Sequence, residues 1–426
     1  MRTPLSVLFV GFLFPLLLTA QIESWKAMGP VNTAHPRHEN SFVEAGNKFY
    51  LLGGRGLKPI DIYDPNTNSW SQGKQPPIEL HHFQAVSHEG LIYVIGAFTG
   101  GYPHEVPISH IYIYDPSADL WIVGPSIPED RRRGAAGVVV IEGKFYIVCG
   151  IVNGHRSHWV PWMDEYDPQT NTWKELADAP RARDHFQAAY FEGKIYAAGG
   201  RRSGSGDTPF QGTLPEVDVY DMKSNSWSTL PSSGNIPTLR AGCTSIVRKG
   251  KLIVIGGESP TQQVAHNEVE ALDLRSYFWK RLDTLQRGRH GTQAILTGNQ
   301  IYIAGGCGNR GGNPELTHLE VLGEPTSSES PAPTLPRGEL ILEQMEVLKT
   351  GEVEMVLSNS EGTQALVLAY LAADQPIASA GGMGFPKILS AGEEITLSFK
   401  RKYPEIPLQV LVKAYGKEAP LEIEIP

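Results

Sequence analysis

Arginine recurs at one fixed place in this sequence, sixteen residues before the first member of a glycine-position pair. The six pairs are Gly53-Gly54, Gly96-Ala97, Cys149-Gly150, Gly199-Gly200, Gly256-Gly257 and Gly305-Gly306. Counting back sixteen residues from the first member of each gives Arg37, Leu80, Arg133, Arg183, Arg240 and Arg289. A guanidinium group binds a carboxylate through two parallel hydrogen bonds, so five converging arginines would suit an acidic ligand. The same side chains could instead form ion pairs inside the protein, and both interpretations stay open at this point.

Histidines and glutamates accompany the arginines. The two residues after each arginine position read His38-Glu39, His81-His82, Gly134-Ala135, Asp184-His185, Ala241-Gly242 and His290-Gly291. Glu258 directly follows the pair Gly256-Gly257. A carboxylate and an imidazole can exchange protons with a substrate, so Glu258 and His185 are candidate catalytic residues that His82 or His290 could assist. The histidines follow no metal-ligand spacing, and the sequence predicts neither a metal ion nor a cofactor.

These residues belong to a repeated phrase, seen whole at residues 183–227. It runs from an arginine through two short apolar runs separated by Gly-Lys, then Gly-Gly, a variable loop, Tyr-Asp and a tryptophan. The apolar runs are too short for helices, are rich in Val, Ile and Tyr, and end at turn residues, which predicts antiparallel strands. Tryptophans follow the Tyr or Leu of the third run by seven residues at Trp70, Trp121, Trp173, Trp227 and Trp279.

The phrase resembles the kelch motif, because these features recur in order about every fifty residues. The resemblance implies an all-β fold, a six-bladed kelch β-propeller with one four-stranded blade per repeat. The sixth repeat has Gly305-Gly306 but no tryptophan after it, whereas residues 22–26 supply Trp25 before the first repeat. We therefore expect the N-terminal strand to pair with Leu319–Leu322 and to close the ring.

Loop lengths select one face of the expected propeller. The first-to-second and third-to-fourth turns are tight, whereas the second-to-third loops are long, at residues 97–110, 151–163, 201–216, 258–268 and 307–317. Scaffolds carry their binding residues on variable loops. The ligand-binding candidates expected on this face are Arg37, His81, His82, Arg133, Arg183, His185, Arg240, Glu258, Arg289 and His290.

The 426-residue chain divides by composition into four parts. Residues 1–20 are predicted to be a signal peptide, with an uncleaved membrane anchor as the alternative. Residues 21–323 make the propeller, and the Pro- and Ser-rich residues 324–336 a linker. Residues 337–426 contain several short strands that predict a small β-sandwich, similar to immunoglobulin-like modules, in which residues 374–392 form a long loop.

Charge and cysteine content set the expected environment. The net charge of −9 argues against nucleic acid and anionic membranes as partners. The three cysteines, Cys149, Cys243 and Cys307, lie in or just after inner strands of different blades and are expected to be buried free thiols. With a signal peptide and no Asn-x-Ser/Thr sequon, a secreted or periplasmic bacterial protein without a membrane span after cleavage is expected.

Two functions are compatible with these residues. The first is a binding module that recognises a glycan, an acidic ligand or a protein partner on the long-loop face. The second follows from a similarity to the exported bacterial N-acetylneuraminate epimerases, which implies cofactor-free mutarotation by an acid and a base. A deep pocket where a glutamate and an arginine converge would favour the enzyme, and a wide shallow mouth the binding module. A galactose-oxidase-like enzyme is disfavoured because the chain has no Tyr-His dipeptide.

Overall fold

The computed structural model describes residues 23–207, 210–323, 338–362, 364–371, 387–400, 408–414 and 421–425. These residues form strands and turns, with two short 3-10 turns at Glu129–Arg131 and Ser232–Gly234. No helix within the described ranges is long and apolar enough to cross a membrane. The predicted signal peptide, residues 1–20, and the predicted linker, residues 324–336, lie outside the described residues.

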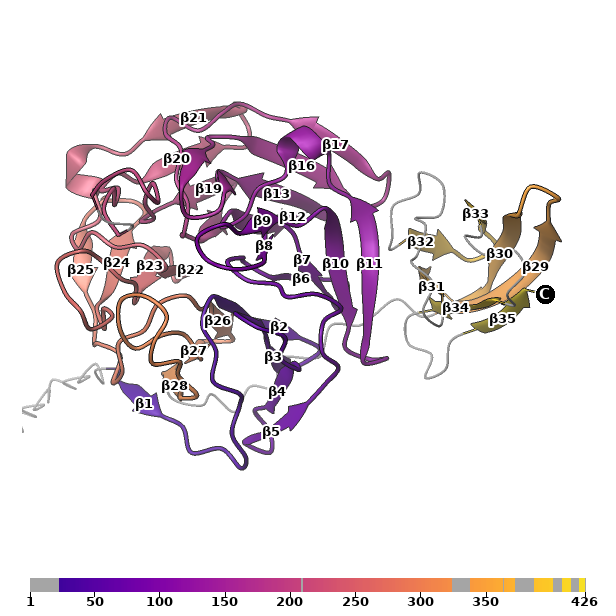
Figure 1. Cartoon of the computed structure of the whole chain (residues 1–426), viewed down its shortest axis with the longest axis horizontal. Helices are drawn as coiled ribbons and strands as arrows, with labels where there is room; N and C mark the ends of the chain where they lie inside the picture. The colour runs from indigo at the N-terminus through magenta and orange to yellow at the C-terminus, as the bar shows by residue number, and fades with distance from the viewer. Residues whose placement is uncertain are drawn as a thin grey trace, which may run out of the picture.

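Six four-stranded antiparallel sheets surround a common axis as the blades of a propeller (Figure 1). In the first three blades the strands are β2 (Asn40–Ala45), β3 (Lys48–Gly53), β4 (Asp61–Asp64) and β5 (Ser69–Gln72); β6 (Val86–His88), β7 (Leu91–Val94), β10 (His110–Asp115) and β11 (Leu120–Ser126); β12 (Gly137–Ile141), β13 (Lys144–Val148), β16 (Met163–Asp167) and β17 (Thr172–Glu175). In the last three they are β18 (Ala188–Phe191), β19 (Lys194–Ala197), β20 (Asp218–Asp221) and β21 (Ser226–Thr229); β22 (Thr244–Arg248), β23 (Lys251–Ile255), β24 (Val269–Asp273) and β25 (Trp279–Arg281); β26 (Ala294–Thr297), β27 (Gln300–Ala304), β28 (Leu319–Leu322) and β1 (Trp25–Ala27). Strands β2, β6, β12, β18, β22 and β26 contact their neighbours around the axis. The predicted six-bladed fold is confirmed.

The N-terminal strand closes the ring, as the sequence predicts. Strand β1 pairs antiparallel with β28, and Trp25 lies opposite Leu322. The Trp25 side chain is buried among apolar residues of the fifth and sixth blades, including Ile253 and Leu285. The last blade is thus completed by the first strand, and no edge of β28 stays open on that side.

The repeated Tyr-Asp phrase and its tryptophan form a hairpin between the third and fourth strands of a blade. Tyr166 pairs with Trp173 across β16 and β17, with ring centroids 4.8 Å apart. The Tyr166 hydroxyl donates to Asn171 in the connecting turn, at 3.2 Å. The seven-residue spacing therefore reflects one tight turn and one cross-strand aromatic pair.

Two sheets form the C-terminal domain. They contain β29 (Gly338–Val347), β30 (Glu352–Gly362) and β33 (Glu394–Lys400) in one sheet, and β32 (Lys387–Ser390), β31 (Gln364–Leu371), β34 (Leu408–Ala414) and β35 (Leu421–Ile425) in the other. Buried residues of both sheets, such as Leu357 and Val412, form one core, as in a β-sandwich. The expectation that residues 374–392 form only a loop is wrong, because the edge strand β32 begins at Lys387.

All three cysteines, Cys149, Cys243 and Cys307, are buried and unpaired by disulfides, as predicted. Burial raises the pKa of the Cys149 thiol to about 11 and also raises that of Cys243. They are small apolar residues of the blade interiors rather than reactive thiols.

Candidate functional site at the propeller mouth

Six equivalent residues, one per blade, lie in a ring of backbone hydrogen bonds where the innermost strands begin. They are Glu39, His82, Ala135, His185, Gly242 and Gly291, and all have positive φ. The N–H groups of five of them, from His82 to Gly291, each donate to the counterpart in the preceding blade, as His82 does to the Glu39 carbonyl at 2.9 Å. In the first blade Asn40 N–H, next to Glu39, donates to the Gly291 carbonyl at 3.1 Å and closes the ring. A left-handed backbone is unfavourable for a residue with a side chain, so the ring holds Glu39, His82 and His185 in a costly conformation. Because the ring surrounds the propeller axis, the side chains of Glu39, His82 and His185 lie close together at the mouth.

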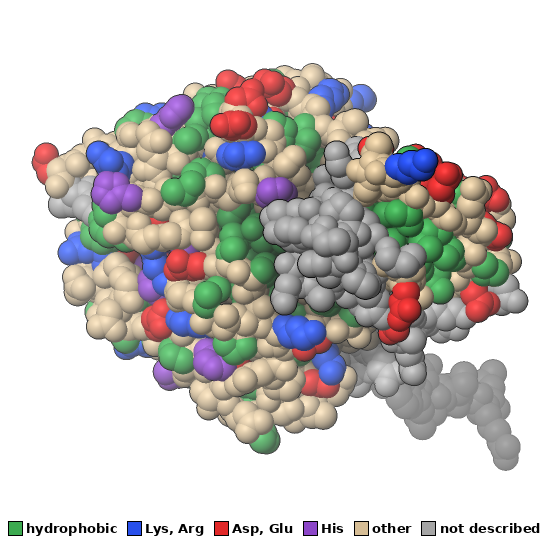
Figure 2. Space-filling model, turned by 45° about the vertical axis from the view of Figure 1, so that its right-hand side comes forward, with side chains coloured by type: hydrophobic (Ala, Val, Ile, Leu, Met, Phe, Trp, Pro, Cys, Tyr) green, Lys and Arg blue, Asp and Glu red, His purple; other side chains and the backbone are tan. Residues whose placement is uncertain are grey.

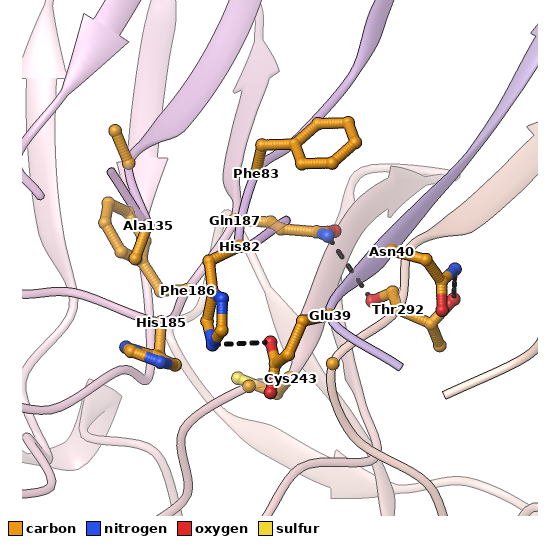
Figure 3. Close-up of a pocket in the computed structure, with 13 residues that line it drawn as sticks. Glu39, Asn40, His82, Phe83, Ala135, His185, Phe186, Gln187, Cys243 and Thr292 are labelled. Carbon is orange, nitrogen blue, oxygen red and sulfur yellow. Dashed lines mark hydrogen bonds and ion pairs between the residues drawn. The ribbon is translucent and has the colours of Figure 1, made fainter. Parts of the chain in front are cut away.

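A cavity of about 480 Å³ opens at this ring. Its lining residues are His38, Glu39, Arg55, His82, Tyr102, His155, Arg201, Phe210, Glu258, His290, Gly311 and Gly312. Most of them come from the second-to-third-strand connections of different blades, so the cavity lies on the long-loop face. Deeper along the axis a pocket of about 30 Å³ is lined by residues including Gln187 and Thr292. His82 and Glu39, which line both cavities, lie side by side (Figure 3).

Glu258 lies at the centre of a buried group of charges in the cavity wall. Its Oε1 accepts a hydrogen bond from Arg201 Nη1 at 2.5 Å, and its Oε2 accepts one from Gly311 N–H at 2.9 Å. Nε2 of His290 lies 3.4 Å from the same Oε2. Burial alone would raise the pKa of Glu258, but the charges of His290 and Arg201 lower it to about 2. Glu258 is therefore a carboxylate at neutral pH.

His290 is the positive partner of this group. Its Nε2 lies 2.9 Å from the Asn309 carbonyl and 2.8 Å from the Gly311 carbonyl, and its Nδ1 lies 3.7 Å from Glu39 Oε1. Burial alone would lower the pKa of His290, but the Glu258 carboxylate raises it to about 10. An imidazolium fits because both ring nitrogens face acceptors.

Three further histidines converge on the opposite side of the mouth. One ring nitrogen from each of His82, His155 and His185 lies within 4.8 Å of the other two, and all three side chains are buried. Burial lowers the pKa of His82 and of His185, which keeps these imidazoles neutral. His82 and His185 were predicted to lie on this face, but their convergence with His155 was not predictable, because the three residues come from different connections that only the closed ring brings together.

The arginines predicted to bind a ligand do not reach the cavity. Arg37, Arg133, Arg183, Arg240 and Arg289 are at most 2% exposed, and their ion-pair partners in the third strands of the same blades are Asp61, Asp164, Asp218, Glu270 and Glu320. Arg183 and Arg289 also donate to the backbone carbonyl sixteen residues further on, which explains the fixed spacing. The prediction of a ligand-binding arginine ring is wrong, because these side chains point into the blades and tie second and third strands together.

Of the other predicted residues, His82, Glu258 and His290 line the cavity. His185 lines the deeper pocket. His81 is fully buried, and its ring contacts His82 Nδ1 and the Gly100 carbonyl instead of the cavity. His81 is therefore a positioning residue behind His82.

Sequence reasoning missed two cavity arginines, Arg55 and Arg201. Both occupy the place that identified Glu258, directly after a glycine pair, so the same rule applied to every repeat would have found them. The aromatic residues Tyr102 and Phe210 at the cavity were also missed, because they lie in long loops without a repeated pattern.

The charge of His290 should be visible in the pH dependence of stability. Its folded-state pKa is raised above the unfolded value of about 6.5, so its stabilisation is complete below pH 6.5 and is lost as the pH rises to about 10. Urea unfolding of His290→Gln should lack this loss. The exposed His158, changed to Gln, serves as the control and should keep the wild-type profile. Parallel profiles for His290→Gln and the wild type would contradict the imidazolium.

Comparison with known proteins agrees with this architecture. A Kelch motif model matches residues 80–128, and a KLHDC2/KLHL20/DRC7 Kelch-repeats domain model matches residues 123–306. Kelch-like protein terF of Aspergillus terreus is 25% identical over 288 residues, which are 64% of this chain and 61% of that protein. Human Kelch-like protein 23 is 25% identical over 307 residues, 68% of this chain and 51% of that protein. The chain thus spans between about half and three fifths of the length of these relatives.

A solved structure has the same fold. The structure of YjhT superposes with a TM-score of 0.58 at 14% identity, covering 68% of this chain and 96% of that one. At this identity the likeness concerns the fold alone. Together with the matching family models and the six closed blades, it leads to one conclusion: the chain belongs to the kelch-repeat family and forms a kelch β-propeller.

Proposed function

We propose that the protein is an exported binding protein that recognises a sugar in the cavity at its propeller mouth. Kelch propellers serve as binding scaffolds, and the cavity volume of about 480 Å³ is within the range of small-ligand sites. Hydrogen-bond donors and acceptors adjoin one another in its wall, as Arg201 and Glu258 do, and the wall residue Arg55 pairs with Glu105 behind it. Adjacent sugar hydroxyls each donate and accept, so they match such pairs.

An acidic ligand is supported less strongly than the sequence suggested. Both cavity guanidinium groups already face a carboxylate, Arg55 that of Glu105 and Arg201 that of Glu258. Figure 2 shows acidic, basic and histidine side chains interspersed over the visible face, without a large field of one sign. A hydroxylated ligand needs no such field, whereas attraction of a simple anion depends on one.

An aromatic rim beside these polar pairs is the observation that carries the proposal. Tyr102 is 58% exposed at the cavity and contacts His155 with ring centroids 5.2 Å apart. Phe210 lies under the guanidinium groups of Arg310 and Arg201, 5.0 and 5.6 Å from its centroid. Two aromatic rings that line one cavity beside polar pairs offer flat apolar surfaces on which the apolar face of a sugar ring can stack.

A glycan array with the mature chain tests this proposal, followed by calorimetric titration of the sugars that bind. Tyr102→Ala should weaken binding about three- to tenfold, since an aromatic contact contributes roughly 0.5–1.5 kcal/mol beyond its buried area. Phe278→Ala provides the matched control, because Phe278 is 69% exposed in a turn between β24 and β25 and does not line the cavity. Binding that Tyr102→Ala leaves unchanged would contradict a sugar site at this rim.

Catalysis of sugar mutarotation is a second candidate, favoured by the convergence of Glu258 and Arg201 in one pocket. Ring opening removes a proton from the anomeric hydroxyl and delivers one to the ring oxygen. Glu258 is placed to accept the first proton and His290 to donate the second. A sugar that separated Arg201 and His290 from Glu258 would remove the contacts that lower the pKa of this carboxyl, and would make it a stronger base.

Exchange between the two anomers of N-acetylneuraminate, followed by NMR, tests this second candidate. The wild-type chain should accelerate exchange, and Glu258→Gln should lower the rate at least a hundredfold, the usual contribution of a positioned base. Tyr102→Ala should raise the KM for the sugar and leave kcat unchanged. If the wild-type chain does not accelerate the exchange, catalysis is excluded and only the binding role remains.

A further inference from the structure

Each of the three histidines at the mouth offers one ring nitrogen to a common point, and these three atoms lie within 4.8 Å of one another. His82 and His185 belong to the backbone ring, whereas His155 lies in the turn between β14 (Ile151–Asn153) and β15 (Ser157–Trp159). Nε2 of His155 lies 2.9 Å from Nε2 of His185. The ring centroids of the three imidazoles are 4.7 to 4.9 Å apart. No backbone carbonyl or hydroxyl is recorded between these Nε2 atoms among the described residues.

Two of these imidazoles, His155 and His185, have a carboxylate next to Nδ1, the ring nitrogen that points away from the other histidines. Nδ1 of His155 lies 2.9 Å from Glu105 Oε1, and Nδ1 of His185 contacts Asp184 Oδ1. The Asp184 carboxylate also accepts hydrogen bonds from Ser203 N–H at 2.9 Å and from the Ser203 hydroxyl at 2.5 Å. A carboxylate only accepts, so a proton on Nδ1 of each ring would face it, and the ring would then present a lone pair at Nε2.

The third imidazole is fixed through a second histidine. Nε2 of His81 lies 2.9 Å from the Gly100 carbonyl, which can only accept, so His81 carries its proton there. Its Nδ1 therefore accepts from His82 Nδ1 at 2.7 Å, and His82 likewise presents a lone pair at Nε2. That Nε2 lies 3.3 Å from Glu39 Oε2, again an acceptor (Figure 3).

Three imidazole lone pairs and one carboxylate thus meet with no donor between them, and a cation at their centre would remove the repulsion. A single proton can bridge only one pair of nitrogens. A metal ion bound at 2.0–2.1 Å from each nitrogen would place tetrahedral ligand atoms about 3.4 Å apart. Nε2 of His155 and of His185 lie 2.9 Å apart, and His82 Nε2 lies 3.3 Å from Glu39 Oε2. One nitrogen of each of the three histidines lies within 4.8 Å of the others, so small side-chain movements would complete the coordination. Outer carboxylates on the Nδ1 atoms are what metal-binding histidines commonly have.

We propose that His82, His155 and His185 bind a divalent first-row transition-metal ion, such as Zn²⁺, with the Glu39 carboxylate as a fourth ligand. Imidazole nitrogen suits Zn²⁺, Ni²⁺, Cu²⁺ and Fe²⁺ rather than Mg²⁺ or Ca²⁺. The site adjoins the cavity, so a ligand oxygen could reach the ion. The inference goes beyond the proposed sugar binding and does not require a sugar.

The test uses the mature chain without an affinity tag, treated with a chelator and then titrated with ZnCl₂ in a calorimeter. One ion per chain is expected, and Co²⁺ in place of Zn²⁺ should give visible absorption bands of a tetrahedral site. His155→Ala should weaken binding at least a hundredfold. Because the His155 side chain is buried beside Glu105, the chelator-treated variant is first shown by circular dichroism to unfold in one cooperative transition, so that lost binding is not confused with unfolding.

His158→Ala is the matched control, since His158 is exposed in the same hairpin, and it should still bind one ion. Glu105→Gln should weaken Zn²⁺ binding about 10–100-fold without touching the ion, as expected for a positioning residue. Stoichiometric Zn²⁺ binding that survives in His155→Ala, or none in the wild-type chain, would overturn the proposal. Neither result depends on sugar binding, which is measured separately on the chelator-treated protein.

Discussion

Truncation of Arg240 to alanine should destabilise the propeller by about 3–5 kcal/mol, the usual cost of leaving one partner of a buried ion pair alone. The Arg240 side chain is fully buried, donates to the Val254 carbonyl at 3.1 Å and lies 3.1 Å from Glu270 Oε2. Without it, Thr238 would be the remaining side-chain partner recorded for the Glu270 carboxylate. Urea unfolding followed by tryptophan fluorescence reports on the propeller, because residues 337–426 contain no tryptophan.

The second blade supplies a natural control for this prediction. There the arginine position is Leu80 and the carboxylate position is Tyr112, and both side chains are buried in one apolar cluster. The double variant Arg240→Leu with Glu270→Tyr copies that blade and should recover much of the stability lost in Arg240→Ala. A fully stable Arg240→Ala that failed to bind sugar would restore the ligand-binding interpretation of the arginine.

The same paired replacement is the evidence in the sequence that these arginines form ion pairs inside the blades. In five of the six third strands an acidic residue stands two places before the Tyr or Leu, at Asp61, Asp164, Asp218, Glu270 and Glu320. In the one repeat without the arginine, the acidic residue is absent too. Both members of the pair change together because either charge alone would be buried without compensation.

The fold was predictable because each repeat fixes its own hairpins. Turn residues and cross-strand pairs such as Tyr166 with Trp173 act within one blade, and closure follows from a tryptophan missing at one end and present at the other. The edge strand β32 was not predictable in the same way, because it is short and its neighbouring segment is rich in Gly and Pro.

The site was only partly predictable, for a physical reason. The places of His82, His185 and Glu258 follow from the repeat, since a fixed offset from the glycine pair sets which residues face the mouth. Their partners come from loops that have no repeat, as His155 and Tyr102 do. Which of these side chains meet depends on how six loops of different lengths fold over one another, and no sequence period encodes that.

Replacement of Trp25 by alanine should lower the free energy of unfolding by about 3–5 kcal/mol, the range for loss of a large buried aromatic. Trp25 is 3% exposed, and its neighbours include Ile253, Leu285 and Leu322 from two adjacent blades. Thermal unfolding followed by circular dichroism measures the loss. Val31→Ala serves as the control, because Val31 is 64% exposed in the same N-terminal segment and its truncation should leave the melting temperature unchanged.

Deletion of residues 21–30 should destabilise the propeller further than Trp25→Ala does. The deletion removes the same aromatic ring and also the pairing of β1 with β28, so the backbone groups along one side of β28 lose their partners. The exposed strand edge should in addition promote association between chains, which size-exclusion chromatography with light scattering would detect as oligomers. If the deletion melted at the wild-type temperature and stayed monomeric, the sixth blade would be stable without the N-terminal strand, and closure by β1 would not contribute to the stability of the ring.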